Sequence, residues 1–196
     1  MLDFNLAFPH SYEIEEVAEH PGDGNFRAPV IYVPPPTKRP EHTGLWLRLR
    51  GKGGKPWIGV FAYGYTSPPA FSRVISSPDP DRVCVVANGS AYIVKVDAPE
   101  VWEQVPIIPV LDVRLLLEKK LLVFGDFIRL AAYGTNGFAW RSSRVCWDGL
   151  RITNVTSELI EGVGYDPTNA ATHESRFAIE LRTGRSLLPS SSSMPD

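Results

Sequence analysis

The chain has 196 residues, 43% of them hydrophobic, with a formal net charge of −2 and a pI near 6.1. This apolar content supports a folded core and excludes a disordered chain, and the small negative charge weighs against nucleic acid as a partner. No apolar run reaches the roughly 20 residues that a membrane-spanning helix requires. The segment 1–9 lacks the basic start of a signal peptide, so we expect a cytoplasmic protein without a membrane partner.

Breaks in regular structure are spread along the whole chain. The 18 prolines and 16 glycines do not cluster in a tail. Both residue types end helices and form turns, so evenly spaced breaks favour many short strands. The composition therefore predicts an all-β protein.

The segment 1–27 is expected to be a lead-in to the β domain. Ser11 is a suitable N-cap for a short helix in which Ile14 and Val17 share a face, and this helix would end at the prolyl-glycine pair after His20. A strand is expected at 28–33. The proline-rich stretch 34–43 is then expected to be a stiff polar connector.

A hairpin is expected from strands 45–50 and 57–63, joined by the turn 51–54. Leucines at 45, 47 and 49 alternate with Trp46, Arg48 and Arg50, so the two sets face opposite ways. A four-residue loop would pair Arg48 with Trp57 and Trp46 with Gly59. This register puts the aromatic residues of the return strand beside Trp46, and Ile58, Val60 and Ala62 beside the leucines. The glycine-rich turn is not a phosphate loop, because Pro56 stands where a Ser or Thr would hold magnesium.

A second hairpin, at 83–97, introduces a repeat. Its tip, Asn88-Gly89, is suited to the positive φ angles of a type I′ turn. Placing Val83 on Leu121 superposes this segment on the next one without a gap and carries Trp102 onto Trp140. Strand-like segments before and after extend the pattern. We expect one β domain at 28–188 with units at 28–70, 71–108, 109–146 and 147–188, followed by a disordered tail at 189–196.

A period of about 40 residues with three or four strands per unit is typical of a propeller blade. The expected architecture is a single domain of repeated antiparallel meanders, propeller-like, with a β-sandwich as the alternative. One detail conflicts with a strict repeat: 97–100 carries the signals of a helical turn, whereas its counterpart 138–141 is strand-like. The signature pairs of the named propeller classes do not recur, so no family is assigned.

The sequence offers no conventional catalytic or metal motif. The four histidines lie beside turn-forming residues, and no Cys or His pair has metal-ligand spacing. We therefore expect no metal and no cofactor. Cys84 and Cys146 lie in apolar runs and are expected to be buried free thiols.

One face of the first hairpin combines large aromatic and basic side chains, a mixture that is enriched at binding surfaces. The candidate binding residues are Trp46, Arg48, Arg50, Trp57, Phe61, Tyr63 and Tyr65. The competing interpretation is that this face packs beneath the 34–43 connector or the lead-in, with the arginine stems along the rings.

The sequence favours a non-catalytic binding or protein-interaction module over an enzyme. Its ligand could equally be a protein, a peptide or a carbohydrate. The alternative function is a hydrolase in which loop carboxylates meet at one end of the strands. Asp126, Asp148 and Asp166 are the candidates for that role.

Overall fold

The computed structural model describes residues 2–17, 27–36, 43–65 and 70–188, and these form sixteen β-strands and no helix. The prediction of an all-β protein is confirmed. No helix in the described segments is long and apolar enough to cross a membrane. The chain divides into two compact units, 1–109 and 110–196, each of which is described by itself. The expected tail at 189–196 lies outside the described residues, as does most of the 34–43 connector.

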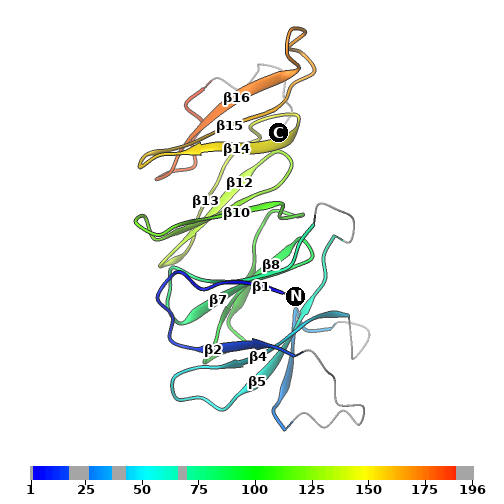
Figure 1. Ribbon diagram of the computed structural model, residues 1–196, viewed down its shortest axis with the longest axis vertical. Coiled ribbons are helices and arrows are strands. Elements are labelled where there is room, and N and C mark those ends of the chain that lie inside the picture. The colour runs from blue at the N-terminus through cyan, green and yellow to red at the C-terminus, as the bar shows by residue number, and fades with distance from the viewer. Residues whose placement is uncertain (1, 18–26, 37–42, 66–69, 189–196) are drawn as a thin grey trace. The chain divides into compact units, whose positions relative to one another are not determined.

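The first unit contains two sheets that stack face to face (Figure 1). One sheet has the order β2-β4-β5-β3. Its strands are β2 (Glu13–Glu16), β4 (Gly44–Arg50), β5 (Trp57–Ala62) and β3 (Val30–Val33). The other has the order β1-β6-β7-β8-β9. Its strands are β1 (Asp3–Asn5), β6 (Arg73–Ser76), β7 (Arg82–Ala87), β8 (Ser90–Lys95) and β9 (Trp102–Gln104).

Alternate residues of the two sheets form the core of the first unit. The leucines of β4 lie in the same buried cluster as Val83 and Val85 of β7 and Tyr92 and Val94 of β8. The alternation in the sequence therefore marks burial, because one face of each strand enters the space between the sheets.

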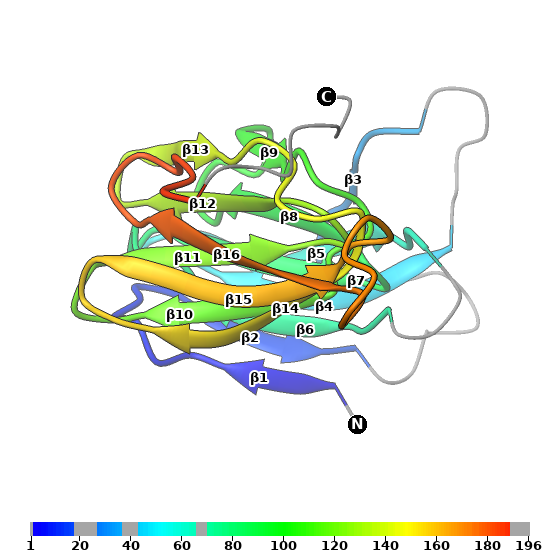
Figure 2. The ribbon, with the colours of Figure 1, turned by 90° about the horizontal axis from the view of Figure 1, so that it is seen from above.

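The described part of the lead-in, 2–17, contains two strands, so the prediction of a helix starting at Ser11 is wrong, and the expected helix end after His20 lies outside the described residues. The Ser11 N–H donates to the carbonyl of Pro80, and its hydroxyl donates to Asp81 over 2.7 Å, so Ser11 caps no helix. The next residues pair antiparallel with β4 as strand β2, while β1 pairs parallel with β6. Each of these N-terminal strands occupies one edge of its sheet (Figure 2). Pairing with a distant strand outweighs a local capping signal here.

The second unit also contains two stacked sheets, with the orders β10-β11-β12-β13 and β14-β15-β16 (Figure 1). The first has strands β10 (Asp112–Leu116), β11 (Leu121–Gly125), β12 (Leu130–Gly134) and β13 (Gly137–Arg141). The second has β14 (Asp148–Val155), β15 (Leu159–Tyr165) and β16 (Glu174–Glu180). Trp140 lies in the core between these sheets, and its indole N–H donates to the carbonyl of Leu181 over 2.7 Å.

The turn residues bear out one local prediction and contradict another. Asn88 and Gly89 join β7 to β8 with φ angles of 47° and 85°, as a type I′ turn requires. The segment after Asp97 forms hydrogen-bonded turns, in which Ala98 donates to Lys95 and Val101 donates to Ala98, so the expected helical turn is wrong. Because β9 follows directly and pairs back onto β8, no room remains for a helix.

Candidate functional site

The register of the β4–β5 hairpin differs by one residue from the expected one. Trp57 pairs with Leu49 and Phe61 pairs with Leu45, whereas Arg48 pairs with Ile58. A one-residue shift moves every side chain of a strand to the other face. Trp57 and Phe61 therefore lie on the leucine face, 4% and 0% exposed, and cannot contact a ligand. The expectation that they share a face with Trp46 is wrong.

Gly59 accounts for this register. A Cβ atom built on Gly59 would lie 2.6 Å from the Phe61 ring and 2.9 Å from the Trp57 ring. The two rings thus close over the space that a side chain would fill. The Trp57 indole N–H also donates to the buried carbonyl of Val96, 2.9 Å away, which anchors the ring between the sheets. The loop before Trp57 is one residue longer than expected as a result.

Five of the seven predicted residues remain accessible in part. Trp46, Arg48 and Arg50 alternate along β4 on the face opposite the core, with Trp46 half-buried and both arginines exposed. Tyr63 and Tyr65 follow β5 and are 44% and 45% exposed. The accessible part of the predicted surface is therefore more basic and less aromatic than the sequence indicates.

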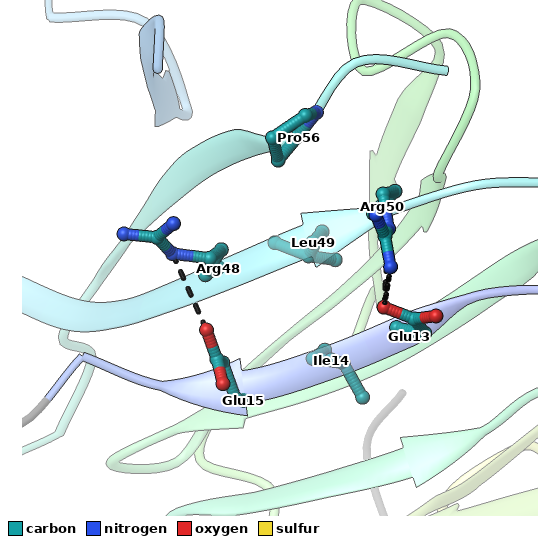
Figure 3. A pocket seen from close by; sticks show the side chains of 7 residues that line it. All are labelled: Glu13, Ile14, Glu15, Arg48, Leu49, Arg50 and Pro56. Atoms are coloured by element: carbon teal, nitrogen blue, oxygen red, sulfur yellow. Dashed lines mark hydrogen bonds and ion pairs between the residues drawn. The ribbon is translucent and has the colours of Figure 1, made fainter. Parts of the chain in front are cut away.

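Two cross-strand ion pairs organise this face (Figure 3). The Glu13 carboxylate accepts from both Nε and a terminal nitrogen of Arg50, at 3.1 and 2.5 Å. The Glu15 carboxylate lies 3.3 Å from Nε of Arg48. Both pairs join residues directly opposite each other on β2 and β4. Neither glutamate was among the predicted site residues because a helix was expected there, although acidic residues alternating about Ile14 are typical of an edge strand.

A pocket lies over these ion pairs. It is lined by Glu13, Ile14, Glu15, Arg48, Leu49, Arg50 and Pro56 (Figure 3). A second pocket shares Glu13 and Arg50 with it and continues over the glycine-rich turn, where Lys52 is exposed. We call this continuous region, from Glu13 and Glu15 across Arg48 and Arg50 to Lys52 and Lys55, the β2–β4 surface.

The glycine-rich turn packs against a carboxyl group of the same unit. A side chain on Gly51 would collide with the Asp97 carboxyl group, and Gly51 itself is buried. The backbone of the turn therefore already faces a carboxylate of the same unit. This arrangement supports the expectation that the segment is a turn and not a phosphate loop.

The carboxylates of the hydrolase alternative all lie in the second unit and all accept local backbone hydrogen bonds. In their own loops, Asp126 accepts from Ile128 and Arg129 and Asp166 accepts from Thr168, whereas Asp148, the first residue of β14, accepts from the N–H of Gly149. Burial raises the pKa of Asp126 above its ordinary value, and the two backbone N–H groups oppose that rise. Short-range capping of this kind is the usual role of Asp in turns.

The two thiols are buried and free, as expected. Burial raises the pKa of the Cys84 thiol and raises that of Cys146 to about 11, so neither is a thiolate at neutral pH. The Cys146 thiol donates to the carbonyl of Phe127. Within the described residues, no group of three or more His, Cys, Asp or Glu side chains is arranged to hold a metal ion.

Comparison with known proteins assigns no family. No family model and no curated protein matches the chain. Among solved structures, the N-terminal domain of Nup159 is similar at a TM-score of 0.37 and 10% sequence identity. The match covers 94% of this chain and 52% of that chain, so this chain spans about half of its length. A likeness this slight carries no functional argument.

Proposed function

We propose that the chain is a non-catalytic binding module that recognises a peptide or a protein segment through the β2–β4 surface. The observation that carries the proposal is the pocket over the Glu13–Arg50 and Glu15–Arg48 pairs. It sets two guanidinium groups on a rigid strand, and sites built on strands are well positioned for recognition.

Two features favour a peptide over the other ligands considered. The lining side chains are mostly charged, and guanidinium groups bind carboxylates and backbone carbonyls through directed hydrogen bonds. Trp57 and Phe61, two of the rings predicted to be available for stacking on a sugar, are buried.

A peptide-display selection on the purified chain tests this function. Linear peptides enriched on the wild-type chain are measured against Arg48→Ala and, as a matched control, Arg182→Ala, whose side chain is 81% exposed in the second unit. We expect a loss of affinity of about tenfold or more for Arg48→Ala, the effect of losing about 1.4 kcal/mol, and no loss for the control. Failure to enrich any peptide, or equal binding to Arg48→Ala, would overturn the proposal.

A further inference from the structure

The guanidinium group of Arg48 is only partly used. Its Nε atom lies 3.3 Å from Glu15, and its two terminal nitrogens point away from that carboxylate (Figure 3). Among the described residues these terminal nitrogens have no ion-pair or hydrogen-bond partner. A guanidinium edge with two free N–H donors matches the two oxygens of a carboxylate. Arg48 therefore presents an unfilled site for an acidic group.

The charges around Arg48 favour an anion. The β2–β4 surface carries four cations, Arg48, Arg50, Lys52 and Lys55, and three anions, Glu13, Glu15 and Asp97 beside the turn, which gives a local charge of +1 (four minus three) on a chain of net charge −2. Lys52 and Lys55 are exposed and form no ion pair with another described residue. The local field therefore attracts negative charge although the whole chain does not.

We infer that the partner bound at the β2–β4 surface is an acidic peptide segment with carboxylates at alternate positions; this inference rests on the proposed function. Arg48 and Arg50 are two residues apart on one strand face, about 7 Å at the usual rise per residue. An extended peptide with an acid at every second residue repeats that spacing on its own face. Its carboxylates bind the free edge of Arg48 and, at that spacing, Arg50 in competition with Glu13, and the lysines of the turn follow Arg50 in the chain.

The internal glutamates determine how such a peptide lies. Glu13 and Glu15 occupy the β2 side of the arginines, so like-charge repulsion excludes an acidic strand from adding to the free edge of β2. The peptide therefore lies over β4 and the turn. Displacing the internal pairs costs little, since exposed ion pairs are worth about 0–1 kcal/mol.

The same charges disfavour a nucleic acid. Nucleic-acid binding draws on many phosphate contacts, and the surface offers a net of one positive charge, with two carboxylates interleaved among the arginines and a third beside the turn. A peptide can place acids at the cations and leave neutral residues opposite Glu13 and Glu15. Single-stranded DNA is therefore a competitor in the test.

Fluorescence anisotropy with the full chain tests the inference. The probe is a short labelled peptide with glutamate at every second position, compared with its glutamine counterpart and with labelled oligo-dT. The Lys52→Glu/Lys55→Glu variant should bind the glutamate peptide about tenfold more weakly. Glu15→Gln, which removes the internal competitor of Arg48, should bind it about threefold more tightly. The control Arg182→Glu/Arg185→Glu makes the same charge change at exposed residues of the second unit and should bind as the wild type does.

The outcomes separate this inference from the proposed function. Binding of the glutamate peptide that falls in the lysine variant and rises in Glu15→Gln supports the acidic partner. Equal binding of the glutamine peptide, tighter binding of oligo-dT, or no change in Glu15→Gln would overturn it. If display-selected peptides without acidic residues still require Arg48, the acidic partner is wrong and the binding module stands. If no peptide that binds the chain loses affinity in Arg48→Ala, the acidic partner and the proposed binding module are both wrong.

Discussion

Tyr12 is a polar side chain placed in an apolar core. Its ring lies in the cluster between the two sheets of the first unit, 6% exposed, and its hydroxyl has no hydrogen-bond partner among the described residues. Burial raises its pKa above the ordinary value, so the phenol stays neutral. A buried hydroxyl without a partner costs free energy that an apolar side chain of the same shape does not.

We predict that Tyr12→Phe stabilises the protein. Removing the unpaired hydroxyl should raise the free energy of unfolding by about 1 kcal/mol, measured by urea denaturation. The matched control is Tyr92→Phe in the same core, because the Tyr92 hydroxyl donates to the carbonyl of Ala62 over 3.0 Å. That variant should lose about 1 kcal/mol. Equal destabilisation by both changes would show that the Tyr12 hydroxyl is hydrogen-bonded after all.

The β4–β5 hairpin shows how a single glycine decides which side chains reach the surface. Without a side chain at Gly59, the rings of Trp57 and Phe61 fill one face together. The arginines of β4 are left on the other face, opposite Ile58 and Val60, which are buried. The basic character of the β2–β4 surface is thus a consequence of aromatic packing on the far side of the same strands.

Gly59→Ala is expected to destabilise the hairpin. Its Cβ would lie 2.6 Å from the Phe61 ring, and both rings are enclosed by the core and have little room to move. Overpacking of this kind costs about 1–3 kcal/mol, to be measured as a fall in the free energy of unfolding. Gly53→Ala is the control, because a Cβ there meets nothing within 4 Å. A loss for Gly59→Ala no larger than for Gly53→Ala would contradict the packing account.

Local sequence signals located most strands but not their partners. The alternation of β4 and the Asn88-Gly89 turn were sufficient to predict two hairpins. The register of the first required knowledge of two rings packing over Gly59, which is a tertiary contact. The parallel pairing of β1 with β6 and of β3 with β5 joins distant segments, and no local pattern encodes it.

The sequence likewise predicts only part of the candidate site. Trp46, Arg48 and Arg50 follow from alternation within one strand. Glu13 and Glu15, which complete the surface, belong to β2. That strand was not predicted because the capping signal at Ser11 indicated a helix. Their pairing with the arginines joins segments that are far apart in the sequence and depends on the antiparallel register of β2 and β4.

For the whole molecule, net charge is a poor guide to its partner. The chain carries a charge of −2, yet the β2–β4 surface carries +1. Attraction of an acidic peptide is therefore confined to about one Debye length, roughly 8–10 Å at ordinary salt. Binding should be short-ranged and should weaken as salt is added.

Mapping amide chemical shifts during a titration tests the location of the binding surface most directly. The ¹⁵N-labelled chain is titrated with the alternating glutamate peptide, and the perturbed amides are assigned. The account predicts that the largest shifts fall on β2, on β4 and on the turn through Lys55, and that they vanish at high salt. Shifts confined to the second unit, or absent from Arg48 and Arg50 at saturation, would contradict it.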